Sequence, residues 1–362
     1  MLRRLTLAFL ALLGVAAIAA CSSGVQNLNI GPSFPTLSLY VTNSTQNAIS
    51  IYAPNPSSSA APLFQIGGSN TQLNGPQYLA FDAQSNLYTT NYNPGTAAAS
   101  VLIYKSQATG NVIPFGQISG SGSGIVQPRG IAIASTGNVY VANVSPASQL
   151  PSSILVFGGL GSLSPSNVIQ GTQTGLNFPA GVALDSNNNL YVANRGSANV
   201  LMFNAPTPGP SPTATPMPTA TPTATPTPNP SASPTATPTP MPVPTGQPPN
   251  ATIGGSATGL VSPVGIAVDG AGNIYVVDAG AGNAGVRVFA PKSNGNVAPT
   301  RTINYSGFVT PTDVKLDKSG NIYVADPGAG KVFIFAAAAS GNATPMAIIP
   351  ASGNVVGLAL AP

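Results

Sequence analysis

Polar side chains recur at one position of the sequence and are the first candidates for a functional site. An asparagine or aspartate follows a short hydrophobic segment six times, at Asn43, Asn91, Asn143, Asn194, Asp278 and Asp326. Amide and carboxylate oxygens are calcium ligands, so a circle of these side chains would form a cation or polar-ligand site. The alternative is structural, because Asn and Asp side chains also cap their own loops in Asx-turns. Recurrence at every repeat favours the structural alternative.

The residue types on which most enzymes rely are missing. The chain has no histidine and no glutamate, its seven acidic residues are all aspartate, and its one cysteine is Cys21. General acid–base catalysis near neutral pH commonly uses histidine or paired carboxylates, and aspartates alone are an unusual ligand set for zinc. We therefore predict no catalytic residue, no metal site and no cofactor, with calcium left open as a ligand of the Asn and Asp oxygens.

Two further groups of side chains have a structural explanation. Asp313 and Lys315 are two apart on one predicted strand, so they face the same side and are expected to form a local ion pair. A tyrosine occupies the same place in each repeat, between apolar neighbours, which indicates packing rather than a sugar-binding platform. These tyrosines are Tyr40, Tyr88, Tyr140, Tyr191, Tyr275 and Tyr323.

The N-terminus predicts export and lipid attachment. Arg3 and Arg4 precede an apolar stretch from Leu5 to Ala17, and small residues then lead to Ile18-Ala-Ala-Cys21, which is typical of a secretory signal. The last four residues resemble the bacterial lipobox, and this resemblance implies that Cys21 is lipidated. We predict a signal peptide at 1–20 and a lipidated tether at 21–36. The protein would then be exported and anchored to a membrane, on the periplasmic or cell-surface side.

Charge argues against a nucleic-acid partner. Only 5% of the residues are charged, and removal of Arg3 and Arg4 leaves nine basic residues against seven acidic ones. The basic residues are also scattered, whereas nucleic-acid binding requires a basic patch. We expect a monomer.

Internal repeats predict the fold. The recurring tyrosines lie 48, 52, 51, 84 and 48 residues apart. Each repeat contains four segments with period-two hydrophobicity, which indicates a four-stranded antiparallel meander. Repeats of this length are typical of propeller blades. We predict an all-β, six-bladed β-propeller over 37–362, in which the C-terminal strand 357–361 joins the N-terminal blade and closes the ring.

The repeat unit resembles the NHL repeat, most clearly at 265–289 and 313–335. Asp313 and Lys315 depart from it, since most repeats have glycine and alanine there. Related propellers include lyases that depend on histidine and gluconolactonase-like enzymes that hold calcium with glutamate, asparagine and aspartate. The resemblance therefore implies one alternative function, a calcium-type, metal-assisted lyase or lactonase. The absence of histidine and glutamate argues against it.

A proline-rich segment interrupts the fourth repeat. Residues 206–249 contain 17 of the 38 prolines and no charged residue. Proline at this density cannot form a sheet ladder and favours extended conformations. We interpret the segment as a disordered Pro/Thr-rich insertion within one blade, not as a linker between domains.

The loops of a propeller are where binding is expected, because a rigid scaffold presents them. We predict a non-catalytic cell-envelope module that binds or scaffolds a protein, a glycan or a wall component. Tyr92, Arg129, Arg195 and Lys331 fall in or beside the loops of one face and are the candidate ligand-face residues.

Lipid attachment can be tested directly. Cys21→Ser should release the protein from the membrane fraction or leave it as unprocessed precursor, because the acceptor thiol is lost. Fractionation followed by immunoblotting measures this. A variant that is processed and membrane-bound like the wild type would contradict the prediction.

Overall fold

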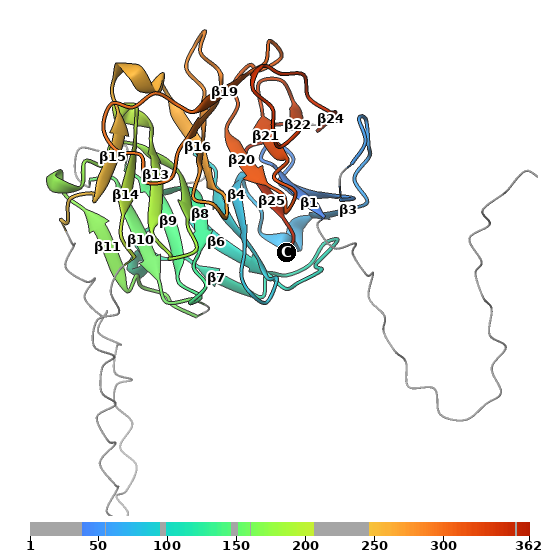
Figure 1. Ribbon diagram of the computed structural model, residues 1–362. Coiled ribbons are helices and arrows are strands. Elements are labelled where there is room, and N and C mark those ends of the chain that lie inside the picture. The colour runs from blue at the N-terminus through green and yellow to red at the C-terminus, as the bar shows by residue number, and fades with distance from the viewer. Residues whose placement is uncertain are drawn as a thin grey trace, which may run out of the picture. The chain divides into compact units, whose positions relative to one another are not determined.

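Six antiparallel sheets form the protein (Figure 1). The computed structural model describes residues 38–54, 56–94, 99–145, 151–159, 161–205, 246–351 and 353–362. Cys21, the signal and tether ranges 1–20 and 21–36, and most of the 206–249 insertion lie outside these residues. The predicted fold class is confirmed: every blade has four antiparallel strands, and one sheet gains a short fifth strand.

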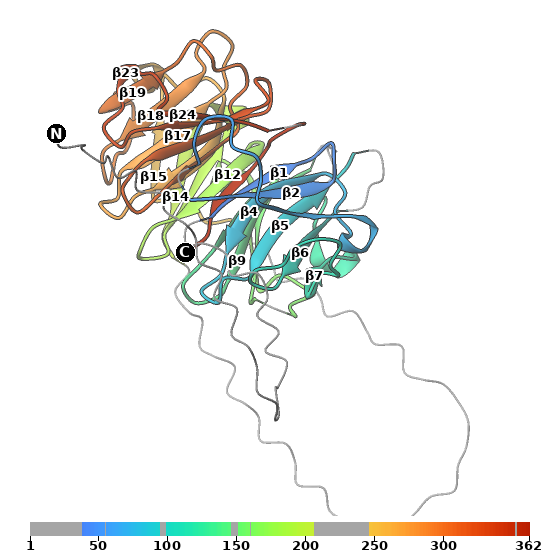
Figure 2. The same ribbon diagram turned by 90° about the vertical axis from the view of Figure 1, so that its right-hand side faces the viewer.

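The first three blades are given from the innermost strand outward, and Figure 2 shows β4 to β7 in this order. Blade one comprises β25 (Leu358–Leu360), β1 (Leu39–Asn43), β2 (Ala48–Tyr52) and β3 (Phe64–Gly67). Blade two comprises β4 (Pro76–Phe81), β5 (Leu87–Tyr92), β6 (Ala99–Tyr104) and β7 (Gly116–Ile118). Blade three comprises β8 (Gln127–Ile133), β9 (Val139–Val144), β10 (Ser153–Phe157) and β11 (Asn167–Gln170).

The other three blades follow the same order. Blade four comprises β12 (Pro179–Leu184), β13 (Leu190–Asn194), β14 (Asn199–Phe203) and β15 (Ala251–Gly254). Blade five comprises β16 (Pro263–Val268), β17 (Ile274–Asp278), β18 (Gly285–Phe289), β19 (Arg301–Asn304) and the added β23 (Gly341–Asn342). Blade six comprises β20 (Asp313–Leu316), β21 (Ile322–Asp326), β22 (Lys331–Phe335) and β24 (Ala347–Pro350).

Short 3-10 helices lie in the loops before or between strands. They are η1 (Ser69–Thr71), η2 (Ser121–Ser123), η3 (Thr172–Thr174), η4 (Arg195–Ser197) and η5 (Ser256–Thr258). No helix in the described part of the chain is both long and apolar enough to span a membrane.

An aspartate starts the hairpin between the first and second strands in four blades. In blade five, Asp269 Oδ1 accepts hydrogen bonds from the amides of Ala271 and Asn273 at 2.9 and 2.8 Å. Its Oδ2 accepts from Asn273 Nδ2 at 2.8 Å and from the Tyr275 hydroxyl at 3.4 Å. Asp185 and Asp317 make the same set of bonds. The hairpin thus also holds the hydroxyl of the repeated tyrosine.

The innermost strands form a closed ring in the order β25, β4, β8, β12, β16 and β20. They approach so closely that there is no space for a side chain at several glycines. A Cβ on Gly265 would lie 2.7 Å from both Thr312 O and Asp313 Cα, and one on Gly130 would lie 2.6 Å from Ala180 O. The Gly-x-Ala pattern of the first strands is therefore a packing requirement.

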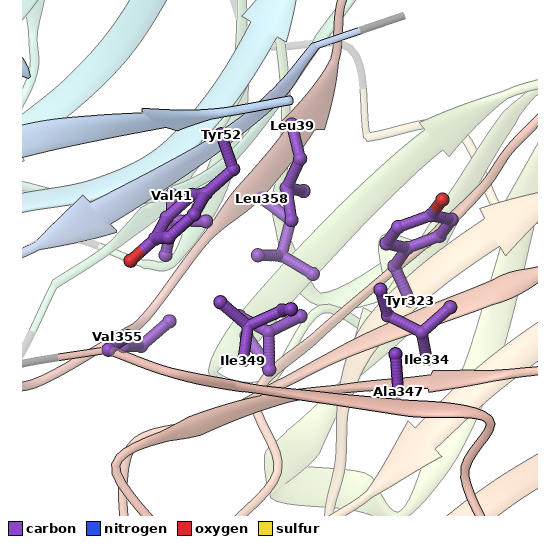
Figure 3. Close-up of a cluster of buried hydrophobic side chains, with 12 residues drawn as sticks. Leu39, Val41, Tyr52, Tyr323, Ile334, Ala347, Ile349, Val355 and Leu358 are labelled. Carbon is purple, nitrogen blue, oxygen red and sulfur yellow. The ribbon is translucent and has the colours of Figure 1, made fainter. Parts of the chain in front are cut away.

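The C-terminal strand closes the ring. β25 pairs antiparallel with β1, opposing Leu360 to Leu39, and Ala361 N donates to Ser38 O at 2.9 Å. Figure 3 shows the apolar seam that results, where Leu39, Val41 and Leu358 meet side chains of blade six. These include Tyr323, Ile334 and Ile349, all of them buried.

Loops cover the outer edges of four blades. Gly110 bridges to Ile66 of β3, Gly295 bridges to Ile253 of β15, and β23 pairs in parallel with β19. On β24, Ile348 O accepts a hydrogen bond from Ser59 N at 3.1 Å. In each case the loop before the fourth strand of one blade satisfies the edge of the preceding blade, which limits unwanted strand addition.

The propeller has two faces. The entry face carries the loops that join fourth to first and second to third strands, and the hairpin face carries the other two kinds of loop. Ser38, Pro362 and both described ends of the proline-rich insertion, Ala205 and Gly246, lie on the hairpin face, because they flank the strand ends that point there.

The close approach of the inner strands predicts the cost of one methyl group at the seam. In Gly357→Ala the new Cβ would overlap Gln77 O and lie 2.6 Å from Tyr78 Cα. We expect a loss of about 1–3 kcal/mol in the free energy of unfolding, measured by denaturant titration. Gly270→Ala is the matched control, because a Cβ there meets nothing within 4 Å. Equal effects of both changes would contradict this account of the seam.

Candidate functional site

The repeated Asn and Asp side chains are hydrogen-bonded to backbone within their own blades. Asn91, Asn143 and Asn194 accept from the amides of Asn74, Val126 and Asn177 at 2.7, 2.8 and 2.7 Å. Asp278 and Asp326 accept from Val261 N and Val309 N at 2.6 and 2.8 Å. Each bond fixes the loop that leads into the first strand of the same blade.

Asn43 makes a different contact. Its Oδ1 accepts from Gln46 N at 3.0 Å and from Thr45 Oγ1 at 3.1 Å, within the turn that follows it. Asp278 and Asp326 combine both arrangements, since they also accept from Gly280 N and Ala329 N. All six side chains are buried. Within the described ranges, no three His, Cys, Asp or Glu residues lie together as metal ligands would.

Two side chains interrupt the glycine and alanine lining of the axis. Tyr78 of blade two reaches across to blade six, where its hydroxyl donates to Thr312 O at 3.3 Å. Burial raises the pKa of Tyr78 far above its ordinary value, Asp313 raises this pKa further, and Arg129 and Arg195 oppose the shift. The tyrosine therefore remains a protonated hydrogen-bond donor.

Asp313 and Lys315 form the ion pair that their spacing indicates, with Nζ 2.8 Å from Oδ1. Asp313 Oδ2 also accepts from Leu358 N at 2.9 Å, so the carboxylate joins blade six to the closing strand. Burial raises the pKa of Asp313, while Lys315 and the amides of Leu358 and Val314 lower it. The two side chains therefore have a structural role, at the seam between blade six and the closing strand.

A cavity of about 400 Å³ opens from the axis on the hairpin face. Its lining is mostly apolar and comes from all six inner strands, with Lys315 and Asp82 as its charged members. Because Lys315 already contacts Asp313 and Asp82 already holds its hairpin, the cavity presents no group poised for acid–base chemistry.

The four candidate ligand-face residues lie on the entry face, at different distances from the axis of the propeller. Arg129 lies in a β-bulge between Pro128 and Ile131 beside the axis, where its carbonyl accepts from Thr90 Oγ1 at 2.8 Å. Arg195 is exposed, and its Nε donates to Ser262 Oγ of blade five at 3.1 Å. Tyr92 and Lys331 end and begin the strands β5 and β22. Arg129 and Arg195 both lower the pKa of Tyr78 through their charge.

The structure adds exposed apolar side chains that sequence reasoning missed. Phe178, Val261 and Val309 are 52%, 55% and 57% exposed, in the loops that lead into the first strands of blades four, five and six. Phe178 has φ +49°, a conformation that bulky residues rarely adopt. Its carbonyl accepts from Arg195 N at 3.2 Å. We call Phe178, Arg195, Val261 and Val309 the mouth patch.

Similarity to known proteins agrees with this architecture. The NHL repeat family matches residues 176–203, in blade four, and the segments 265–289 and 313–335 are the equivalent strands of blades five and six. No curated protein matches the sequence.

Solved structures show the same fold at low sequence identity. A Bacteroides caccae protein of unknown function is 12% identical with a TM-score of 0.56, over 90% of this chain and 99% of its own. Two proteins provisionally assigned as 6-phosphogluconolactonases, from Bacteroides uniformis and Bacteroides fragilis, are 16% and 15% identical with TM-scores of 0.53 and 0.52. Both matches cover 90% of this chain. They cover 99% of the Bacteroides uniformis chain and 97% of the Bacteroides fragilis chain.

The bonds of the repeated acidic position predict a stability effect. Asp326 accepts three amides with its two oxygens, and Asp326→Asn would turn an NH₂ group toward one of them. We expect a loss of about 1–3 kcal/mol in the free energy of unfolding, measured by denaturant titration.

Calcium provides the control for this prediction. If the position is structural, the melting temperature of the wild type should be the same in calcium chloride and in EDTA. A rise in calcium that Asp326→Asn removes would instead identify a cation site.

Proposed function

Because the chain is a six-bladed β-propeller that carries an NHL repeat, we propose that it is a non-catalytic binding module that docks a partner protein on its entry face. The observation that carries this proposal is the mouth patch. It combines an exposed aromatic ring, two exposed valines and an exposed guanidinium, on loops held by the buried Asn and Asp side chains. Aromatic and arginine side chains dominate the binding energy of protein interfaces.

The charge of the entry face indicates the chemistry of the partner. Asp278, Asp313 and Asp326 are buried and bonded to amides or to Lys315. The other four aspartates lie at hairpins on the opposite face. The charged side chains left at the surface of the entry face are cationic, namely Arg129, Arg195 and Lys331. An acidic segment with apolar or aromatic side chains is therefore the complementary partner.

Backbone strain supports a functional role for Phe178. A left-handed conformation costs a bulky residue on the order of 1–3 kcal/mol, and a glycine would remove this cost. A half-exposed ring gains little from burial, so stability does not explain the choice of phenylalanine. Contact between the exposed ring of Phe178 and a partner protein explains it.

Membrane attachment through Cys21 is part of the same proposal. Ser38 lies on the hairpin face, so a lipidated tether that ends there would hold the hairpin face toward the membrane. The entry face would then point away from it, in the periplasm or at the cell surface, and be free to bind.

A defined acidic copolymer tests the docking chemistry. The full chain should bind poly(Glu,Tyr) more tightly than poly(Glu), and should not bind poly(Lys,Tyr), in isothermal titration calorimetry. Phe178→Gly combined with Arg195→Gln should weaken binding about tenfold or more. The melting temperature should not fall, because glycine relieves the strain at position 178.

The hairpin face offers a matched control. Phe115 is 50% exposed, and Lys105 Nζ lies 4.7 Å from its ring centroid. Lys105→Gln combined with Phe115→Ala therefore removes a cation and an exposed aromatic ring elsewhere and should leave binding unchanged. Equal losses in both double variants, or no binding by the wild type, would refute the proposal.

A further inference from the structure

A second cavity lies at the rim of the entry face, between blades five and six. Its volume is about 650 Å³, within the range of ligand pockets. The side chains that line it are uncharged, and most are amides or hydroxyls. They are Asn283, Asn304, Asn342, Ser306, Thr344 and Tyr305.

At this cavity, blade six departs from the repeat. In blades two to five, a glycine with positive φ follows the fourth strand of the preceding blade and starts a 3-10 helix, as Gly255 starts η5. Blade six has Tyr305 in place of this glycine, and its described loop contains no 3-10 helix. The loop is also two residues shorter, running from Asn304 to Val309 where blade five runs from Gly254 to Val261.

The shortened loop changes the role of Asn342. In the equivalent position, Asn111 and Asn296 accept hydrogen bonds from the 3-10 amides of Asn70 and Ala257, both at 2.7 Å. Asn342 follows Gly341 as these residues follow Gly110 and Gly295, yet its blade lacks the 3-10 helix. Its exposed amide lines the cavity instead, directly opposite Asn304 in the ladder between β19 and β23.

Tyr305 is the aromatic residue of the cavity lining, and its ring is fixed by its neighbours. Its ring packs edge-on against Phe308, Phe333 and Phe335, with centroids 5.7, 5.2 and 5.9 Å away. The remaining part of this half-buried residue lines the cavity. On the far wall, Asn283 accepts from the buried Arg287 Nη2 through both its carbonyl oxygens, each at 2.7 Å. Ring packing therefore fixes Tyr305, and hydrogen bonds from Arg287 fix Asn283.

We propose that this cavity, which we call the rim cavity, binds a neutral saccharide. Amides can donate to and accept from sugar hydroxyls at once, and an aromatic wall suits the apolar C–H surface of a pyranose ring. The absence of charged side chains from the lining favours an uncharged ligand. This site is separate from the mouth patch and does not depend on the proposed protein partner.

Oligosaccharides of defined charge test the site. The full chain is titrated by calorimetry with maltohexaose, cellohexaose, chitohexaose and the acidic hexagalacturonate. At least one neutral sugar should bind, and more tightly than hexagalacturonate. Asn304→Ala combined with Asn342→Ala should weaken it about tenfold or more. Replacing Tyr305–Gly307 with the five residues of Gly255–Gly259 removes Tyr305 and Ser306 from the lining and should abolish binding.

Two controls separate this site from general polarity and from the mouth patch. A cavity of about 530 Å³ between blades two and three is lined mainly by amides and hydroxyls, without an aromatic ring, so Gln117→Ala combined with Ser121→Ala should leave sugar binding intact. The Phe178 and Arg195 double variant should also retain it. Failure of all three neutral sugars to bind, or an unchanged affinity in the Asn304 and Asn342 variant, would overturn the proposal.

Discussion

The approach of the six inner strands, backbone against backbone, is the constraint on which the rest of the structure depends. Where Gly130, Gly181 and Gly265 lie, the neighbouring blade leaves no space for a Cβ. Each blade buries its faces only against its two neighbours, so this contact sets how all the others pack. The two blades that break the pattern do so with side chains that span blades: Tyr78 reaches Thr312, and Asp313 holds Leu358 N.

The two candidate binding surfaces lie where a loop differs from the loop that most blades share. In blades two to six, a buried Asn or Asp at the end of the second strand fixes the loop that leads into the inner strand, as Asn194 and Asp278 do. The residues around that anchor differ from blade to blade. Phe178 and the short loop at Tyr305 are such variations, and both candidate surfaces are built on them.

Much of the fold could be predicted from sequence, because period-two hydrophobicity and the tyrosine spacing are local signals of strands and blades. The closing strand also followed, since blade one lacked an inner strand and 357–361 could supply it. The partners of the repeated Asn and Asp could not be assigned, because in most blades they lie in a loop earlier in the chain. At the rim cavity the sequence shows a shortened loop with Tyr305 in place of glycine, but not the space that results, and the left-handed conformation of Phe178 leaves no local signal because it is a backbone angle.

The covered outer edges have a consequence for how this protein avoids pairing edge to edge with a second molecule. Most β-proteins keep exposed edge strands apart with lysines and other charges, but only 5% of this chain is charged. Here Gly110, Gly295 and the β23 segment occupy backbone groups that a second molecule would otherwise pair with. These contacts therefore limit strand addition at the covered edges by geometry rather than by charge repulsion. We expect a change that removes one of these loops to favour self-association through the edge that it uncovers.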